Sequence, residues 1–185
     1  PESTVAIITR RNRDIERVLK LLETHKIPVS SQRRVDIFNH PVASAFWSLA
    51  EFLYDPTNFE ALAKSLVAGL WGLSFEESIS LVRDLRSGRV SNLEKTLPAF
   101  SRIRGRMLED GALGCLIYSA EESGFAGMVS EEPSRIHVWR GIIALSETLI
   151  RESRIEDPRE LLSKLLSYKD EYEVVHSTLK DYLEE

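Results

Sequence analysis

The sequence of 185 residues contains a single cysteine, Cys115, and lacks any long apolar run. One cysteine excludes an internal disulfide. Its place in the apolar stretch LGCLIY favours a buried thiol over a nucleophile, since no histidine is near it in the sequence. No apolar run approaches the roughly 18 residues that span a bilayer, and no cleavable signal is visible. We therefore expect a cytoplasmic protein that has no membrane partner.

The signatures of common self-contained enzymes are also missing. The chain has no glycine-rich phosphate loop followed by lysine, no H-E-x-x-H, no G-x-S-x-G and no cysteine pair. Four histidines, His25, His40, His137 and His176, lie far apart in the sequence without metal-ligand spacing, which favours surface or capping roles. We expect no metal site in this chain.

Charge is distributed unevenly along the chain. The first 40 residues carry eight Lys or Arg and five Asp or Glu, a net charge of +3, and the other 145 carry 16 and 24, a net charge of −8. This balance argues against strong, general nucleic-acid binding. Any contact with DNA therefore has to be local.

The stretch from Val5 to Val29 has the pattern of a β-α-β unit. Val5–Ile8 is a short, largely β-branched run, typical of a strand buried on both faces, and Ile27–Val29 starts a second extended piece. Between them lies the apolar stripe of a one-sided helix, at Ile15, Val18, Leu19 and Leu22. One such unit leaves strand edges and a sheet face uncovered, so we infer that the rest of the sheet belongs to a larger protein.

The remainder of the chain has helical apolar spacing almost throughout. The predicted fold class is therefore mainly α: a helical bundle over residues 35–185, preceded by the β-α-β unit in residues 1–34. The expected helices are Pro41–Tyr54, Asn58 to about Val67, Ser74 to near Gly88, a short one capped by Ser91 and Glu94, about Pro98–Leu108, Leu113–Glu122, about Ile136–Arg151, Pro158 to about Ser167, and roughly Glu171–Leu183.

Several of these helices have clear start or stop signals. Thr57 with Glu60, and Ser74 with Glu77, have the spacing of a capping box. The Asp55–Pro56 pair predicts the end of the helix before it, because the residue preceding proline disfavours α geometry. On the helix that follows Ser74, the residues expected to be buried are Ile79, Val82 and Leu85.

Two places have unusual residues for their position. Arg10 follows a buried strand, where open α/β sheets present groups to ligands, so its guanidinium either clamps a phosphate or is an ordinary surface arginine. The stretch Gly69–Ser74 is apolar, contains two glycines and leads into a helix. Its backbone amides either hold a phosphate, or the stretch is a tight turn in which Trp71 and Leu73 staple two helices together.

At these residues the sequence resembles a known family. The stretch VAIITRRNRDIERVLKLLETHKIPV is similar to the motif-IV segment of superfamily 1 DNA helicases of the UvrD/Rep and RecB/AddA type, in which a strand ends in Arg-x-Asn and a helix and a short strand follow. The continuation VDIFNHPVASAFWSLAEFLYDPTNFEALAKSLVAGLWGLSFEES resembles the accessory region that follows in those proteins, and its GLS..E turn looks closer to the RecB/AddA branch.

This resemblance implies an assignment for each part of the chain. Residues 1–34 would belong to the second RecA-like motor domain, and residues 35–185 would be the helical accessory subdomain inserted in it. Arg10 would reach the γ-phosphate of ATP, Asn12 would fix the turn after the strand, and ATP and Mg would bind only in the intact parent.

The resemblance also implies DNA contacts and partners. Gly72, Leu73 and Ser74 match a turn that contacts duplex DNA in UvrD-like members. The partners implied are DNA at a single-strand/duplex junction, the rest of the helicase chain and a partner subunit.

The resemblance also predicts what this polypeptide lacks. The phosphate-binding loop and the acidic metal-binding motif of such motors are absent from its sequence, so the fragment alone should hydrolyse no ATP. Local positive charge that could follow a nucleic-acid backbone, or simply be solvated, is found at Arg33, Arg34, Arg102, Arg104 and Arg106.

Two other interpretations remain. The chain could instead be a helical protein-interaction module that uses the surface around Trp47, Trp71 or Trp139 against a subunit or another partner. A stand-alone α/β-containing enzyme is the third.

Overall fold

The computed structural model describes the backbone of residues 7, 17–18, 21–22, 24–25, 27, 37–90, 92–107 and 109–184. Within those ranges it leaves out the side chains of residues 133–134 and 173–184. The chain divides into two compact units, Pro1–Arg34 and Val35–Glu185. The assignment of these units to a motor domain and an accessory subdomain stays a prediction.

The first unit is described at only a few positions. Arg17, Val18, Leu21, Leu22 and Thr24 are helical, in the stretch where the sequence predicts a helix. Ile7 and Ile27, the described members of the two expected strands, have no strand assignment. The other residues of the expected β-α-β unit lie outside the described residues, so the structure gives this unit no support.

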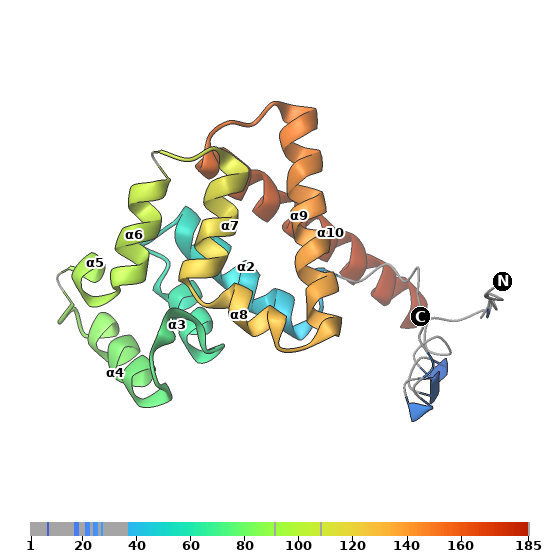
Figure 1. Cartoon of the computed structure of the whole chain (residues 1–185), viewed down its shortest axis with the longest axis horizontal. Helices are drawn as coiled ribbons and strands as arrows, with labels where there is room; N and C mark the ends of the chain where they lie inside the picture. The colour runs from blue at the N-terminus through green and yellow to red at the C-terminus, as the bar shows by residue number, and fades with distance from the viewer. Residues whose placement is uncertain are drawn as a thin grey trace. The chain divides into compact units, whose positions relative to one another are not determined.

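The second unit is helical in all its described elements, which confirms that the chain is mainly α. Figure 1 shows its helices, which run along the chain in the order given next. They are α2 (Pro41–Tyr54), α3 (Phe59–Val67), the 3-10 helix η1 (Leu70–Gly72), α4 (Phe75–Arg86), α5 (Leu93–Thr96), α6 (Pro98–Arg106), α7 (Ala112–Glu122), α8 (Phe125–Ser130), α9 (Pro133–Ser153) and α10 (Pro158–Glu184). Among the described residues, no helix combines the length and apolar character needed to cross a membrane.

Helix α2 is the centre of this bundle. It begins at Pro41, whose fixed φ suits the first helical turn, and the Nδ1 atom of His40 accepts a hydrogen bond from the Val42 amide at 3.2 Å. It ends before Asp55–Pro56, as the sequence predicts. Four helices, α3, α8, α9 and α10, contact α2 from different sides. Burial on several faces explains why the sequence of α2 is apolar almost all round.

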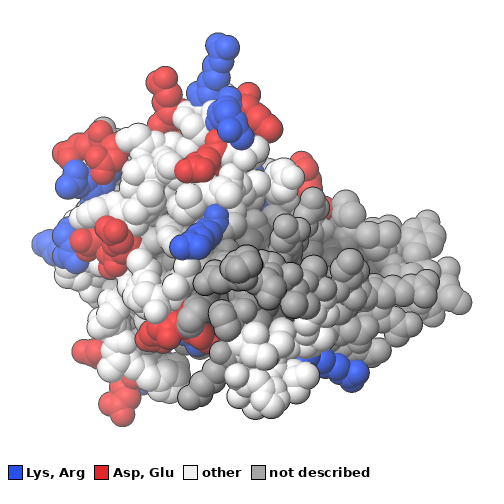
Figure 2. All heavy atoms as spheres, turned by 45° about the vertical axis from the view of Figure 1, so that its right-hand side comes forward, with Lys and Arg blue, Asp and Glu red and all other residues white. Residues whose placement is uncertain are grey.

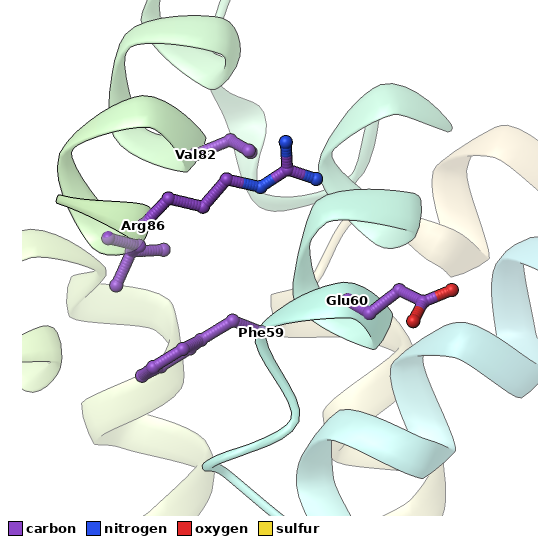
Figure 3. A pocket seen from close by; sticks show the side chains of 5 residues that line it. Phe59, Glu60, Val82 and Arg86 are labelled. Carbon is purple, nitrogen blue, oxygen red and sulfur yellow. The ribbon is translucent and has the colours of Figure 1, made fainter.

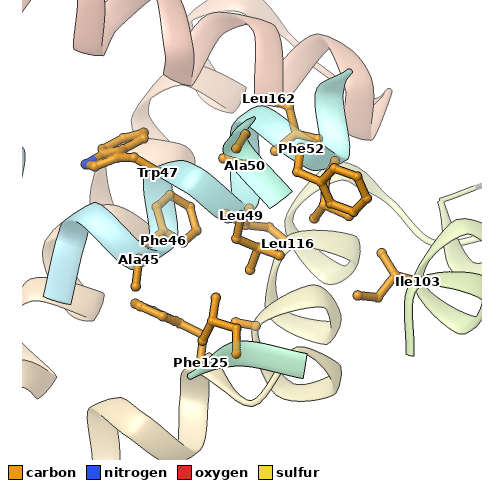
Figure 4. Packing of buried hydrophobic residues seen from close by; sticks show 14 of the residues in the cluster. Ala45, Phe46, Trp47, Leu49, Ala50, Phe52, Ile103, Leu116, Phe125 and Leu162 are labelled. Atoms are coloured by element: carbon orange, nitrogen blue, oxygen red, sulfur yellow. The ribbon is translucent and has the colours of Figure 1, made fainter. Parts of the chain in front are cut away.

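The core is made of side chains that different helices direct toward α2. Figure 4 shows Leu49 of α2 beside Leu116 of α7, and Phe46 of α2 above Phe125 of α8. The rings of Phe46 and Phe125 are 5.6 Å apart in a tilted arrangement. Aromatic rings in such tilted pairs contribute more than their buried area alone. The helices are therefore fixed relative to one another by interlocking aromatic side chains.

The segment before α2 is also anchored on the bundle. The indole Nε1 of Trp47 donates to the carbonyl of Ile37 at 2.9 Å, and the ring of Phe38 stacks on that of Tyr172 with centroids 4.3 Å apart. Ile37 lies against Gly141 of α9, where a Cβ would be 2.5 Å from Ile37 Cγ2. A glycine at position 141 therefore lets this segment approach α9 closely.

Several details differ from the sequence predictions. Asn92, not Ser91, caps α5, and its side chain accepts a hydrogen bond from the Lys95 amide at 3.0 Å. Asn58, not Thr57, caps α3, because the Thr57 hydroxyl instead donates to Asp55 Oδ1 at 2.6 Å. Helix α8 (Phe125–Ser130) was not expected. The two helices expected after Pro158 are one helix, α10, of 27 residues. After Pro158 at its first position, this helix has no proline or glycine, so neither of these residues stops it once it has begun.

Candidate functional site

The structure describes three of the predicted site residues and leaves four undescribed. Arg10, Asn12, Arg33 and Arg34 lie outside the described residues, so their roles stay predictions. Gly72, Leu73 and Ser74 lie at the junction between η1 and α4. The stretch Gly69–Ser74, which we call the junction, contains η1 and leads into α4, and it is the candidate site within the described residues.

The backbone of the junction turns sharply through left-handed conformations. Gly69 has φ 87°, Trp71 has φ 76° and Gly72 has φ 66°. Glycine adopts such angles freely, whereas a large side chain does so at a cost of about 1–2 kcal/mol. Strain at Trp71 persists only because surrounding contacts hold it. One of them is the Trp71 amide, which donates to the Ser123 carbonyl at 2.7 Å.

The side chain of Trp71 supplies the other contacts. It is 6% exposed, and its Nε1 donates to Ser65 Oγ at 2.8 Å. Its ring meets Phe52 edge-on at a centroid distance of 5.7 Å and Phe100 at 6.4 Å. Leu73 is partly buried against the same core. These contacts favour the staple interpretation of the junction over a phosphate-binding loop.

The start of α4 is closed by the capping box that the sequence predicts. The Glu77 amide donates to Ser74 Oγ at 3.3 Å, and the Ser74 amide donates to Glu77 Oε2 at 2.8 Å. The hydrogen bonds from Ser74 hold the pKa of Glu77 below its ordinary value of 4.5. Glu76 adds a second carboxylate to this turn. The two carboxylates repel a phosphate, and the Ser74 and Glu77 amides already donate hydrogen bonds within the capping box. This helix end is therefore poorly suited to phosphate binding.

The side chains of the three tryptophans proposed as an interaction surface are mostly buried in the core. Trp47 is 2% exposed and Trp71 is 6% exposed. Trp139 is partly buried, with its ring 5.8 Å from Phe46 and 5.5 Å from Phe125. The indoles therefore serve the core, and an interaction surface has to be sought elsewhere.

The arginines on α6 are each paired with an acid. Arg102 lies 2.7 Å from Glu122, Arg104 lies 2.7 Å from Glu94, and Arg106 lies 3.5 Å from Asp110. Figure 2 shows acidic and basic side chains interspersed over one face of the described residues. Mixed charge of this kind does not form a continuous positive track for a phosphate backbone.

The remaining candidate groups have structural roles in the described residues. Cys115 is buried, and burial raises the pKa of its thiol, which keeps the thiol protonated and a poor nucleophile. His40 caps α2, as the capping interpretation of the histidines allows. No group of three or more His, Cys, Asp or Glu side chains in the described part of the chain is arranged to hold a metal ion.

The surface of the described residues is hollowed at several places, including the following two. One is a notch of about 230 Å³ lined by Phe59 and Glu60 of α3 and by Val82, Leu85 and Arg86 of α4. Figure 3 shows the Phe59 ring on the α4 side of this notch and the Glu60 carboxylate directed away. The other is an open groove of about 620 Å³, lined by Pro41, Val42, Ala45, Ala68, Gly69, Gly124, Gly127, Met128, Glu131 and Arg135.

The sequence analysis did not identify the exposed apolar residues of α3 and α4. Phe75 is 69% exposed, Ile79 is 47% exposed and Phe59 is 44% exposed. The expected burial of Leu85 is confirmed, that of Ile79 is wrong, and Val82 is only partly buried. The inward side of α4 carries Ser78 and Leu81 beside Leu85. A helical projection centred on Leu81 and Leu85 would have placed Phe75 and Ile79 away from the buried face of the helix.

In comparisons with known proteins, no family model, curated protein or solved structure matches the chain.

Proposed function

We propose that this chain is part of an ATP-dependent DNA helicase or helicase-nuclease of the UvrD/RecB/AddA kind, acting in DNA repair or recombination. In this proposal residues 1–34 are the motif-IV β-α-β segment of an incomplete RecA-like sheet. The observation that carries the proposal is the order of the two parts: a motif-IV-like stretch, Val5–Val29, lies within the first unit, which ends at Arg34, and a helical unit follows.

Arg10 would carry the chemistry of the intact parent. A guanidinium at the end of a strand can stabilise charge on the γ-phosphoryl group in the transition state and couple nucleotide state to closure of the cleft. Asn12 would fix the turn that positions it. ATP and Mg would be held by motifs that this sequence lacks, so the described residues provide no test of that site.

The helical unit would contribute structure and a local DNA contact. The turn at Gly72, Leu73 and Ser74 offers less to DNA than the resemblance implies, because Glu76 and Glu77 occupy the adjoining helical turn. The basic pair Arg33 and Arg34 then becomes the better candidate for a DNA contact, next to the boundary between the two units.

Binding of a fluorescent hairpin DNA with a single-stranded tail tests the DNA contact. We expect weak binding whose affinity falls with added salt, and a logarithmic salt slope that drops by about two in the Arg33→Ala/Arg34→Ala variant. Arg102→Ala/Arg104→Ala is the matched control, since both arginines are paired with glutamates and should change the slope little. Binding whose affinity does not change with salt, or no binding at all, would contradict a DNA contact made by this chain.

ATP turnover tests the fragment itself. We expect none, with or without DNA, because the sequence has no phosphate-binding loop. A DNA-stimulated rate that Arg10→Ala abolishes would show that the polypeptide carries a complete motor site.

A protein-interaction module remains the second candidate. The observation that favours it is the exposed apolar surface of α4, where Phe75 and Ile79 face solvent. Residues of this kind on a charged chain are typical of a surface that another protein covers.

A further inference from the structure

Helix α4 presents an apolar stripe to solvent. Phe75, Ile79 and Val82 recur at the spacing i, i+4, i+7, which places them on one side of the helix. Phe75 and Ile79 are exposed and Val82 is partly buried. The stripe lies next to the inward face of Ser78, Leu81 and Leu85 and is not part of it.

The stripe ends at the notch described above. Val82 and Leu85 form one wall of the notch and the Phe59 ring forms another, while Arg86 lies at its edge. The notch therefore has room for a side chain between Phe59, Val82 and Leu85, and the charged residues Glu60 and Arg86 also line it. Phe75, at the opposite end of α4, is a large side chain without such a pocket in its own chain, at 69% exposed.

Charge along α4 changes sign from one end to the other. Glu76 and Glu77 are in the first turn, and Arg83 and Arg86 are in the last. Within the described residues, no ion pair is recorded for Glu76 or Arg83, which lie on the same side of the helix at i, i+7. The outer surface of α4 thus has an acidic end, an apolar middle and a basic end.

We propose that this surface binds a second copy of the chain, with the two α4 helices antiparallel across a two-fold axis beside Ile79. A two-fold interface requires each patch to complement itself. Reversing α4 places its acidic end opposite the basic end of the second copy, so Glu76 faces the second copy's Arg83 and the Ile79 side chains meet.

The same arrangement fills the notch twice. Seven residues separate Phe75 from Val82, about 10 Å along a helix. Because Ile79 lies about midway between these two residues, an antiparallel copy related by an axis beside Ile79 brings each Phe75 ring over the Phe59–Val82–Leu85 notch of the other copy. Dimer formation needs neither DNA nor ATP, so its test is independent of the helicase assignment.

Sedimentation velocity of the full chain over about 1–200 µM, the range of weak to moderate dimers, measures the association. We expect the 21.1 kDa chain to form a concentration-dependent dimer. Ile79→Glu should weaken the dimer at least about tenfold, because a carboxylate would be placed at the two-fold axis. Ile117→Glu is the matched control: this isoleucine is 38% exposed and belongs to α7, whose main neighbours are α6, α8, α9 and α10, so its replacement should leave the dimer unchanged.

A charge exchange tests the antiparallel register. Glu76→Arg and Arg83→Glu should each weaken the dimer, and the double variant should restore it to within about threefold, since the pair is then present in reverse. Circular dichroism confirms that each variant is folded. A chain that stays monomeric, a dimer indifferent to Ile79→Glu, or a charge exchange without recovery would overturn the proposal; the last result would favour a different partner.

Discussion

Ten of the 14 residues of α2 are buried, whereas three of the 12 residues of α4 are. Both helices have large apolar side chains, but α2 has one charged residue, Glu51, whereas α4 has five. The difference in burial follows this composition and the number of neighbouring helices together. Helix α2 is contacted by α3, α8, α9 and α10, while α3 is the main neighbour of α4. The number of neighbours decides whether an apolar side chain becomes core or surface. Apolar residues of α2 therefore stabilise the fold, and those of α4 are available for binding.

The largest test of this comparison replaces one phenylalanine in each helix. Phe52→Ala should lower the free energy of unfolding by about 3–5 kcal/mol, because its ring is fully buried against Trp71 and Phe100. Phe75→Ala removes the same atoms from an exposed position and should change stability by less than about 0.5 kcal/mol. Urea unfolding followed by circular dichroism measures both. Equal losses would show that α4 is part of the core.

A second test concerns the turn that delivers the chain to α4. Gly69→Ala should destabilise the fold by about 1–2 kcal/mol, since φ at this position is +87° and an alanine Cβ is strained there. Gly127→Ala is the matched control: this glycine is inside α8 and has no atom within 4 Å of a built Cβ. We expect it to be neutral or to stabilise by up to about 1 kcal/mol. A tolerated Gly69→Ala would contradict the left-handed turn.

A third test removes the cap of α4. Ser74→Ala should cost about 1 kcal/mol of unfolding free energy, because the Glu77 amide loses its acceptor. Ser87→Ala, at the other end of the same helix, removes an exposed hydroxyl that bonds only to the Asp84 carbonyl, and should cost less than about 0.5 kcal/mol. The same denaturation assay compares them.

The smallest effect concerns pH at the same cap. Hydrogen bonds from Ser74 lower the pKa of Glu77 in the folded chain, so its carboxylate favours folding above the ordinary pKa of 4.5. This contribution is lost as pH falls through 4.5 towards the lowered folded-state pKa. The stability advantage of the unmodified chain over Glu77→Gln should therefore shrink on acidification in a denaturation series from about pH 7 to pH 3. An advantage that grows at low pH would contradict the capping geometry.

Local signals in the sequence predicted many helix ends. Pro41 starts α2, Asp55 stops it, and Ser74 with Glu77 opens α4, as expected. Such signals work because each is satisfied by backbone groups within a few residues. The extra break expected within α10 was not supported by a proline or glycine, and that expectation failed.

The candidate site could be predicted only in outline. A glycine-containing turn at Gly69–Ser74 was expected, with a phosphate loop and a structural staple both open. The choice between them depends on Ser65, Phe100 and Ser123, which contact Trp71 from three other helices or helix ends. No local pattern identifies such partners. The roles of Arg10 and Asn12 in a helicase stay predictions.

By itself, the sequence determined that the chain after Pro41 is a series of helices, and where several of them begin and end, because caps and prolines act over one turn. Tertiary structure alone decided which face of each helix is covered. Ile79 is surface and Trp71 is core because α3 approaches α4 on the side of Ser78 and Leu81, while Trp71 is enclosed by Phe52 and Phe100. Burial depends on neighbours that lie far away in the chain, and apolar spacing does not specify them.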